Sequence, residues 1–410
     1  MKVRLVNLGC RSNYFDTEFI ACQLRHKGYS VSSEGPADLY VVNTCTVTAE
    51  ADRSSRQAIY RAKRENPDAI VVVTGCYAQI SPGALAKLKE VDLIVGNSEK
   101  HRLVEILEDF LEGKGQRVYV ENIFRSSRLE SFDLVAYFEK ARPFLKVQEG
   151  CNSFCTFCVI PFARGKVRSV PVERVVAQAK LLAERGFKEI VLTGTQLTQY
   201  GQDRGTSLYE LLRELLKVRE IELIRLSSLH PSEVREDLLE LLLWEDRIAP
   251  HFHLSLQSGS DRILQLMERG YRVEDYRKLV ERIVSTRPIS AVGTDLIVGF
   301  PSEREEDFAQ TCQLLEELPI AYAHIFPYSD RPFTKSSKMA HKVSPSVKRE
   351  RVQRLKQIEA KKRELFRSAN RGRELRAVVI EEGKLLTENY LELKGETQAP
   401  VGQLIRVKVE

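Results

Sequence analysis

Residues 150–158 read Gly-Cys-Asn-Ser-Phe-Cys-Thr-Phe-Cys, so Cys151, Cys155 and Cys158 stand four and three positions apart. The stretch follows an apolar run at 144–147 that predicts a strand, and a glycine-led loop there can fold three thiols around one compact centre. Thiolates are the usual ligands of iron–sulfur clusters. Zinc is the alternative, but zinc sites usually use four ligands in paired Cys-x-x-Cys halves, and no fourth Cys or His is close in the sequence. Inert structural cysteines are a third interpretation; the dense spacing favours a cluster, and three ligands on a four-iron cube leave one iron open.

The cysteine stretch lies near the start of a long α/β region. Apolar runs that predict strands alternate there with helical patterns, which indicates crossover connections. The alternation predicts an incomplete parallel barrel or a doubly wound sheet, and periodicity does not separate the two. The strand-like runs lie at 144–147, 189–192, 223–226, 252–256, 290–298 and 323–326, and the helical patterns at 172–185, 208–218, 235–243, 274–285 and 305–318.

The first 112 residues alternate in the same way. Their strand-like runs are rich in Val, Ile and Leu without period-two alternation, which is typical of parallel strands buried on both faces. The region therefore predicts a separate parallel-sheet α/β domain. The runs lie at 3–8, 39–43, 70–74 and 93–95, and the helical patterns at 13–27, 49–64, 82–89 and 99–112.

Three further cysteines each follow one of these strands. Cys10 comes after the run at 3–8, Cys45 after 39–43 and Cys76 after 70–74. Parallel strands share a carboxyl edge, where ligand sites form, so we expect a second site of three thiolates at this edge. The alternative is three buried strand-end cysteines, since a free cysteine is often buried. Cys22 and Cys312 lie inside helical apolar patterns and are interpreted as core residues.

Composition excludes several classes of protein. The 410 residues are 43% hydrophobic, enough for folded cores, and no run approaches the ~20 apolar residues of a membrane span. The N-terminus lacks the pattern of a secretory signal, so we expect a cytoplasmic protein without membrane partners, in which cysteines are ligands or core thiols rather than disulfides. The formal charge is only +6, but residues 342–376 contain thirteen basic and four acidic side chains. A basic block beside a nearly neutral body indicates a phosphate-bearing partner.

At this point the sequence resembles a known family. CNSFCTFC matches the CxxxCxΦC signature of the radical S-adenosylmethionine superfamily, with Phe157 as the aromatic residue. With Cys10, Cys45 and Cys76 in LGC, NTC and TGC contexts, nearly the whole chain resembles the radical S-adenosylmethionine methylthiotransferase family. The resemblance implies a partial (β/α)6 barrel in the centre, so the expected fold is an N-terminal parallel-sheet α/β domain, this barrel, a basic helix and a small C-terminal β module.

The resemblance also implies the chemistry. Cys151, Cys155 and Cys158 would hold a 4Fe–4S cluster whose open iron binds S-adenosylmethionine, and reductive cleavage, fed by an electron donor, would yield a 5′-deoxyadenosyl radical that abstracts hydrogen. Cys10, Cys45 and Cys76 would hold an auxiliary 4Fe–4S cluster that supplies or relays sulfur, and a second S-adenosylmethionine would give the methyl group. Weaker family matches imply cofactor contacts at strand ends, although each stretch could be an ordinary strand-to-loop turn. These tentative cofactor-binding residues are Phe157, Thr193, Gly194, Gln257, Ser258, Asp295 and Gly299.

Members of this family act on three substrate types. Two are tRNA adenosines beside the anticodon that carry an isopentenyl or a threonylcarbamoyl group, and the third is an aspartate of a small-subunit ribosomal protein. The strings VVNTCTVT, VTGCYAQISP, LKVQEGC and CTFCVIPFARG look most like the threonylcarbamoyl-adenosine enzymes. The rival classes are a non-enzymatic RNA-binding protein with structural metal and an electron-transfer oxidoreductase.

RNA binding has a physical argument of its own, because basic side chains neutralise backbone phosphates and an anticodon loop offers unstacked bases. Solvated helix faces are the alternative interpretation of the same charge runs. The C-terminal residues resemble a short TRAM module, a small RNA-binding β-barrel. The tentative RNA-binding residues are Arg53, Arg56, Arg349, Arg354, Lys361, Lys362 and Arg371.

Three stretches need separate mention. Phe333 stands where the family usually has glycine, and since Phe does not adopt a positive φ cheaply, we expect that turn to differ. The stretch at 195–200 also departs from relatives, whereas Arg164 and Gly165 match the family pattern without a role evident in the sequence. The predicted organisation is a methylthiotransferase domain at 1–112, a linker at 113–140, a radical S-adenosylmethionine domain at 141–335, a basic helical segment at 336–372 and the TRAM-like module at 373–410.

Overall fold

The computed structural model describes residues 1–126, 129 and 141–410. They form two compact units. The first contains Met1–Tyr137, Glu149–Val170 and Ser329–Ser337, and the second contains Phe138–Gln148, Pro171–Tyr328 and Lys338–Glu410, in each case so far as these residues are described.

Within the described part of the first unit, six strands form one parallel sheet in the order β2-β1-β3-β4-β5-β6. All six residues of β3 are buried, as are all but the first residue of β4, which is why the sequence lacks alternation there. The strands are β1 (Lys2–Asn7), β2 (Ser30–Ser32), β3 (Leu39–Thr44), β4 (Ile70–Gly75), β5 (Leu93–Val95) and β6 (Val118–Tyr119).

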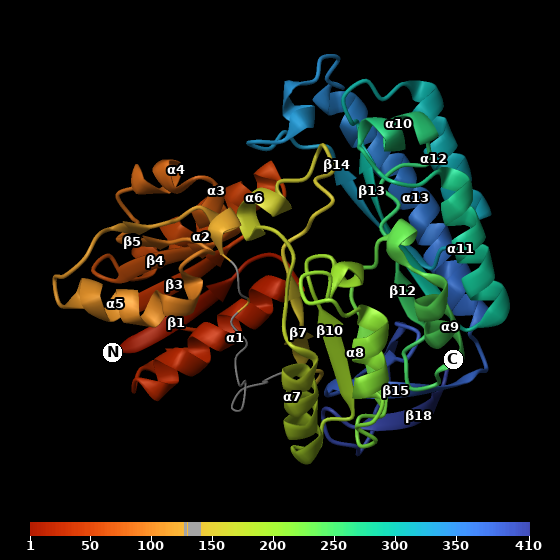
Figure 1. Cartoon of the computed structure of the whole chain (residues 1–410), viewed down its shortest axis with the longest axis horizontal. Coiled ribbons are helices and arrows are strands. Elements are labelled where there is room, and N and C mark those ends of the chain that lie inside the picture. Colours follow the sequence, from red (N-terminus) through yellow and green to blue (C-terminus); the bar gives the residue numbers. More distant parts are fainter. Residues whose placement is uncertain (127–128, 130–140) are drawn as a thin grey trace. The chain divides into compact units, whose positions relative to one another are not determined.

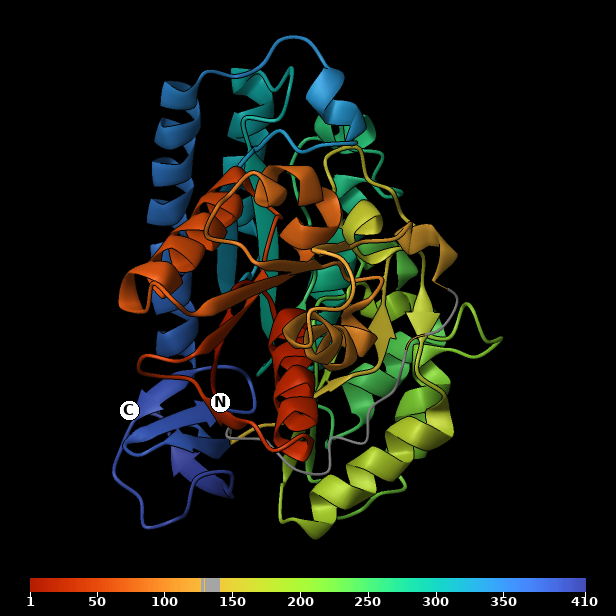
Figure 2. The same ribbon diagram turned by 90° about the vertical axis from the view of Figure 1, so that its left-hand side faces the viewer.

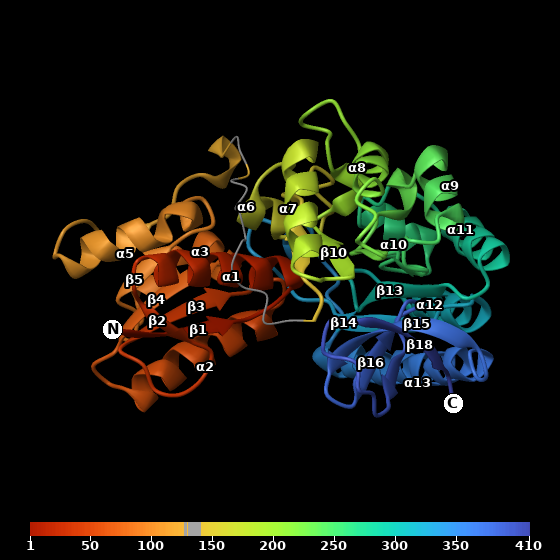
Figure 3. The ribbon, with the colours of Figure 1, turned by 90° about the horizontal axis from the view of Figure 1, so that it is seen from below.

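Helices cover both faces of this sheet, and Figure 3 shows α2 on one side with α1 and α5 on the other. Helix α2 begins where the Thr48 hydroxyl accepts a hydrogen bond from the Ala51 N–H at 3.1 Å, an ordinary N-cap. Its Ile59 and Ala62 are buried against the Val and Tyr side chains of β3 and β4. The helices are α1 (Arg11–His26), α2 (Ala49–Glu65), α3 (Cys76–Ile80), α4 (Pro82–Ala86), α5 (Leu103–Leu111) and α6 (Ile160–Arg164), with the short strand β9 (Arg168–Ser169) after α6.

The second unit contains the barrel. Among its described residues, two three-stranded parallel sheets run β7-β10-β11 and β12-β13-β14, and parallel bridges such as Ile224 to Ile248 join them. Strands that are neighbours in space follow one another along the chain, so the incomplete barrel is confirmed and the doubly wound alternative is excluded. The strands are β7 (Phe144–Lys146), β10 (Glu189–Thr193), β11 (Leu223–Leu226), β12 (His251–His253), β13 (Ala291–Val298) and β14 (Tyr322–Pro327), and β8 (Gln148–Glu149) begins where this unit gives way to the first.

Helices alternate with these strands, and Figure 1 shows α11, α12 and α13 beside β13 and β14. Buried Tyr276, Val280 and Ile283 recur at helical spacing on α11, which is how an amphipathic helix presents one face to a sheet. The helices are α7 (Val172–Glu184), α8 (Leu208–Leu215), α9 (Glu236–Trp244), α10 (Asp261–Leu266), α11 (Val273–Thr286), α12 (Glu305–Glu317) and α13 (Pro345–Ala369).

The basic segment forms the long helix α13, which leads into the C-terminal module (Figure 2). In the described range 370–410, four strands form an antiparallel sheet in the order β17-β16-β15-β18. These strands are β15 (Glu374–Glu381), β16 (Lys384–Thr387), β17 (Glu392–Lys394) and β18 (Leu404–Lys408).

The turn between β16 and β17 is attached to the barrel strands. Buried Arg225 of β11 donates hydrogen bonds to the carbonyls of Glu388 (2.9 Å) and Thr387 (3.2 Å), and its guanidinium also pairs with Glu189 of β10 at 2.7 Å. The ring of Tyr390 stacks on His251 of β12 with centroids 4.1 Å apart. The module and the barrel therefore form one packed body within the second unit.

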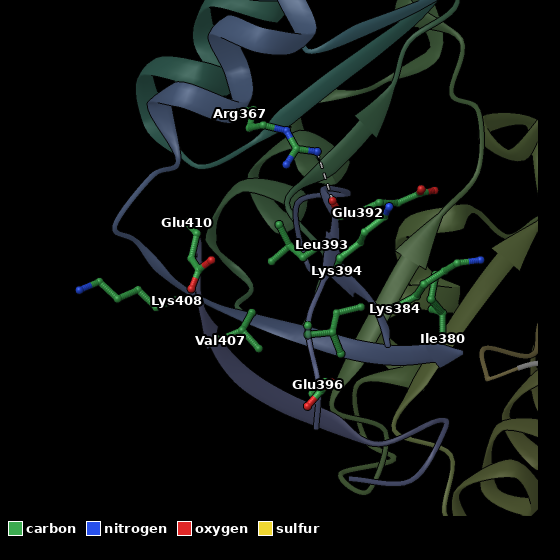
Figure 4. A pocket seen from close by; sticks show the side chains of 12 residues that line it. Arg367, Ile380, Lys384, Glu392, Leu393, Lys394, Glu396, Val407, Lys408 and Glu410 are labelled. Carbon is green, nitrogen blue, oxygen red and sulfur yellow. Dashed lines mark hydrogen bonds between the residues drawn. The ribbon is translucent and has the colours of Figure 1, made fainter. Parts of the chain in front are cut away.

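A cavity of about 700 Å³ lies between the C-terminal sheet and the end of α13 (Figure 4). Arg367 reaches across it to the Glu392 carbonyl at 3.4 Å. The rim mixes basic Lys384, Lys394 and Lys408 with acidic side chains, a composition that favours neither an anionic nor a cationic ligand.

The structure corrects some sequence-based expectations. Residues 118–119 form β6, although they were expected in a linker; a two-residue strand is too short to give a periodic signal. The rest of the predicted linker at 113–140 lies partly outside the described residues. The loop at 149–170 belongs to the first unit. The predicted domain boundaries, including the one at 141, stay predictions. Phe333 does adopt a left-handed φ of 66°, so the expected change of turn is not seen at this residue. No helix of the described residues is both long enough and apolar enough to span a membrane.

Candidate active site at two cysteine trios

The carboxyl ends of β1, β3 and β4 bring together Cys10, Cys45 and Cys76, which we call the edge trio. Cys10 is the N-cap residue of α1, Cys45 follows β3 directly, and Cys76 is the first residue of α3. Because β3 lies between β1 and β4, the three residues stand at neighbouring positions on one edge. The expected convergence is therefore present. Cys22 and Cys312 are buried in helices, as expected for core residues.

Glycines keep the backbone tight around the edge trio. Gly75 has a φ of 97°, and a Cβ there would lie 2.4 Å from the Thr44 carbonyl oxygen. Gly9 has a φ of 105°, and its Cβ would lie 3.0 Å from the Cys45 sulfur. Only glycine allows these conformations without strain, so the space beside the Cys45 thiol depends on residues without a side chain.

The edge trio is electrostatically coupled. Burial, together with the neighbouring Cys76 and Cys10, raises the pKa of the Cys45 thiol to about 12. Cys76 is also buried, whereas Cys10 is exposed. Three clustered soft donors of this kind fit an iron–sulfur cluster, because iron binding stabilises the thiolate form that burial disfavours.

Cys151, Cys155 and Cys158, which we call the loop trio, lie between β8 and α6. The Cys158 N–H donates to the Cys155 carbonyl at 2.9 Å, and the Cys151 N–H donates to the Gly165 carbonyl at 3.1 Å. Gly150 has a φ of 79°, and a Cβ there would lie 1.9 Å from the Lys166 carbonyl oxygen. Backbone bonds thus fold the loop, and its thiols are the donor set that a cluster requires.

Both trios belong to the first unit, and α6 packs against α3. Cys76 shares an apolar cluster with Val159, which directly follows the loop trio, and with Ala163 of α6. All eight cysteines are described, and all are thiols rather than disulfides.

Aromatic side chains pack together at the segment that contains the loop trio. The rings of Phe124, Phe154 and Phe162 lie with their centroids 6.0–6.2 Å apart, and Phe333 lies 5.6 Å from Phe162. Phe157, predicted as a cofactor contact, is half-buried in the same loop.

The structure also places the other tentative cofactor residues. Thr193 and Gly194 lie at the end of β10, where a Cβ on Gly194 would meet the Gln148 side chain at 2.7 Å. Gln257, at a φ of 77°, exchanges backbone hydrogen bonds with β13, and Ser258 beside it is buried.

Gly299 directly follows the end of β13, with a φ of 73°, and its N–H donates to Glu303 at 2.8 Å. Gln257, Ser258, Asp295 and Gly299 are thus gathered around β13, whereas Thr193 is the last residue of β10 and Gly194 follows it.

Asp295 is held by neighbours that the sequence did not indicate. Its carboxylate accepts hydrogen bonds from Ser255 (2.7 Å), His253 (3.0 Å) and His324 (3.2 Å). Burial alone would raise the pKa of Asp295, but these hydrogen bonds hold it well below its usual value. In the described residues, the two histidines and Asp295 also have the spacing of a metal site, with ligand atoms within 4.8 Å, yet the three donors already account for the carboxylate.

The tentative RNA-binding residues fall on two helices and a turn. On α2, Arg53 is exposed, whereas Arg56 is half-buried and donates to the Tyr77 hydroxyl at 3.0 Å. On α13, Lys362 donates to the Glu316 carbonyl at 2.9 Å, and partial burial lowers its pKa. The remaining residues are exposed, namely Arg349, Arg354, Lys361 and Arg371.

Two known protein families match separate parts of the chain. Residues 2–96 match the model of the uncharacterized protein family UPF0004, and residues 145–315 match the radical SAM superfamily. The chain is 61% identical to the threonylcarbamoyladenosine tRNA methylthiotransferase MtaB of Aquifex aeolicus, over 100% of both chains. This chain belongs to the radical S-adenosylmethionine methylthiotransferase family.

Another relative within the methylthiotransferase family matches at lower identity. The tRNA-2-methylthio-N(6)-dimethylallyladenosine synthase of Ruegeria sp. is 34% identical, over 100% of this chain and 96% of the relative. Among solved structures, the radical S-adenosylmethionine methyltransferase TsrM from Kitasatospora setae has a TM-score of 0.61 at 18% identity and covers 82% of this chain and 77% of its own, so the likeness is one of fold. Family membership makes the chain a transferase that uses 4Fe–4S clusters and S-adenosylmethionine.

Proposed function

We propose that the chain is a tRNA methylthiotransferase that converts threonylcarbamoyladenosine next to the anticodon into its 2-methylthio derivative. The observation that carries the proposal is identity of 61% along the full length to an enzyme named for this substrate, against 34% to one named for the dimethylallyl substrate. The isopentenyl-type base is therefore the second candidate.

In this proposal each trio holds one 4Fe–4S cluster. Cys151, Cys155 and Cys158 hold the radical S-adenosylmethionine cluster, and Cys10, Cys45 and Cys76 hold the auxiliary one. When bound, the clusters and S-adenosylmethionine supply the radical chemistry and the sulfur and methyl groups. The donor chemistry, the close approach of Gly9 to the Cys45 side chain and the tight backbone packing at Gly150 support the assignment.

The chain's own residues orient the cofactor and exclude water. The ends of β10 and β13 offer small and polar groups at Thr193, Gly194, Gln257, Ser258 and Gly299, as a nucleoside needs at the carboxyl edge of parallel strands. Asp295 stays ionised because its pKa is held low, and its bonds to Ser255, His253 and His324 fix the residues around this end of β13. Phe157, which is half-buried in the loop, is proposed as an apolar contact of the cofactor.

We propose that tRNA is bound electrostatically. The exposed side chains of Arg53, Arg349, Arg354, Lys361 and Arg371 can neutralise backbone phosphates, which gives affinity without reading sequence. Arg56 and Lys362 have partners within the fold, so we assign them a smaller share. A TRAM-like C-terminal module, the predicted domain boundaries, a cytoplasmic location and a separate electron donor complete the proposal.

The experiment is nucleoside mass spectrometry of tRNA from a strain that lacks the gene. We expect loss of the methylthio group from threonylcarbamoyladenosine alone, restored by the intact gene. Loss from the isopentenyl base instead would transfer the function to the second candidate, and no change would refute both.

Two cysteine variants test the site in the purified, reconstituted enzyme. Cys155→Ala should abolish deoxyadenosine formation, whereas Cys45→Ala should still cleave S-adenosylmethionine but form no methylthio product. Because two four-iron clusters amount to about eight irons per chain, each variant should retain about half of the iron. Methylthio product from Cys45→Ala would contradict the auxiliary assignment.

A further inference from the structure

Arg164 is the last residue of α6, and its side chain is only 2% exposed. Its guanidinium donates to the Asn13 side-chain oxygen, to Glu149 and, at 3.3 Å, to Asp16. A buried cation is tolerated when it is paired and hydrogen-bonded, and here both conditions are met. Arg164 thus links the segment that follows the loop trio with the first turn of α1, which follows Cys10.

Asn13 extends this network to the carboxyl ends of two neighbouring strands, β1 and β3. Its side-chain nitrogen donates to the Leu8 carbonyl at 2.6 Å and to the Thr44 carbonyl at 2.9 Å. Leu8 lies two residues before Cys10, and Thr44 lies directly before Cys45. One amide therefore fixes two backbone segments of the edge trio while its oxygen accepts from Arg164.

The third member of the edge trio meets the same helix. The Asn97 side-chain nitrogen donates to the Ala163 carbonyl of α6 at 2.8 Å and lies 3.6 Å from the Cys76 sulfur. The Cys76 side chain itself packs on Val159 and Ala163. Helix α6 thus contacts the surroundings of all three edge cysteines.

The network around Arg164 is charged and buried. Lys100 pairs with Asp16 at 2.8 Å, and Arg168 pairs with Glu149 at 3.2 Å. The Arg164 charge acts on Cys76 and Cys10 directly. Without this guanidinium, Asp16 and Glu149 would each lose a cationic partner close to thiolates that also carry negative charge.

We propose that Arg164 is a positioning residue that fixes the spacing between the loop trio and the edge trio and supplies positive charge beside the edge trio. The role rests on the proposed function, because the trios hold clusters only under that proposal. A fixed spacing matters for this reaction, since sulfur from one site has to reach a substrate activated at the other.

The test uses Cys155→Ala as the parent protein, because only the edge trio can then hold a cluster. Arg164→Met and Arg164→Lys are added to this parent, and Arg225→Met is the control, since Arg225 is a buried, paired arginine of the second unit. Iron per chain and the midpoint potential of the remaining cluster, followed by electron paramagnetic resonance, are measured.

Arg164→Met should lower the midpoint potential, because loss of a nearby positive charge disfavours the reduced cluster, and should reduce the bound iron. Arg164→Lys should recover most of the potential but not the iron, because an ammonium lacks the planar fork that reaches Asn13 and Glu149 together. Arg225→Met should leave both unchanged.

Potential and iron equal to those of the parent in Arg164→Met would overturn the role and leave the proposed function intact. Should Arg164→Met not fold, Arg164→Lys decides: full iron and an unchanged potential there would overturn the positioning role. A parent without any cluster would instead refute the cysteine assignment, and the role of Arg164 with it.

Discussion

Gly75→Ala should be among the most damaging single-methyl changes in the first unit. Gly75 stands at φ 97° and ψ −164°, a region essentially restricted to glycine, where another residue costs roughly 1–3 kcal/mol. The added Cβ would also lie 2.4 Å from the Thr44 carbonyl oxygen and 2.6 Å from the Asn43 side chain, and relief of such overpacking costs about 1–3 kcal/mol. The expected loss of unfolding free energy is therefore about 2–6 kcal/mol.

The assay is urea denaturation of the iron-free protein, followed by iron analysis after reconstitution. Gly83→Ala is the matched control, because a Cβ there meets nothing within 4 Å and the residue lies in α4. Alanine in a helix is favoured over glycine, so the control should gain up to about 1 kcal/mol.

Cys76 follows Gly75 directly, so the shift of backbone should also remove iron from the edge trio and leave that of the loop trio. A Gly75→Ala protein with the stability of the wild type and its full iron content would refute the argument that this glycine shapes the site.

Three further predictions concern other parts of the chain. Burial, aided by the positive charge of Arg269, lowers the pKa of His230 to about 3. The unfolded state therefore binds the proton more readily, and stability is lost as the pH falls below about 6.5. His230→Gln should reduce the loss of unfolding free energy between about pH 7 and pH 5, measured by denaturation, by roughly 2 kcal/mol. Arg225→Met should lower the free energy of unfolding by about 3–5 kcal/mol, because Glu189 loses a buried partner. Breaking the exposed pair of Arg406 and Glu374 should lower it by less than about 1 kcal/mol. Equal losses in urea denaturation would contradict this prediction. Gly150→Ala should empty the loop trio of iron, and retained deoxyadenosine formation would count against that prediction.

The sequence predicted the features that come from repetition along the chain. Buried strands such as β3 and β4 show as apolar runs, and three cysteines placed after such runs must share an edge once the sheet is parallel. The strands that it missed, β2, β6, β8, β9 and β16, have only two to four residues each, too few to give a periodic signal.

Contacts between distant segments could not be predicted in the same way. Arg164 and Asn13 are 151 residues apart, and no local pattern marks them as partners. Asp295 and its partners His253 and His324 lie on three separate strands, so no local pattern in the sequence joins them. For Phe333 the residue type alone was a poor guide. Phe disfavours a left-handed φ, yet Phe333 adopts one, because the surrounding chain imposes it.

The attachment of the turn at 387–390 to Arg225 and His251 limits how the last forty residues can be used. These contacts hold the module against the barrel strands rather than on a free linker. Under the proposed function, a tRNA bound to this module would lie at a fixed distance from the barrel strands, because folding sets the position of the module on the barrel. Truncation of the chain before this turn would remove this constraint and would also expose the His251 ring of β12, on which Tyr390 stacks.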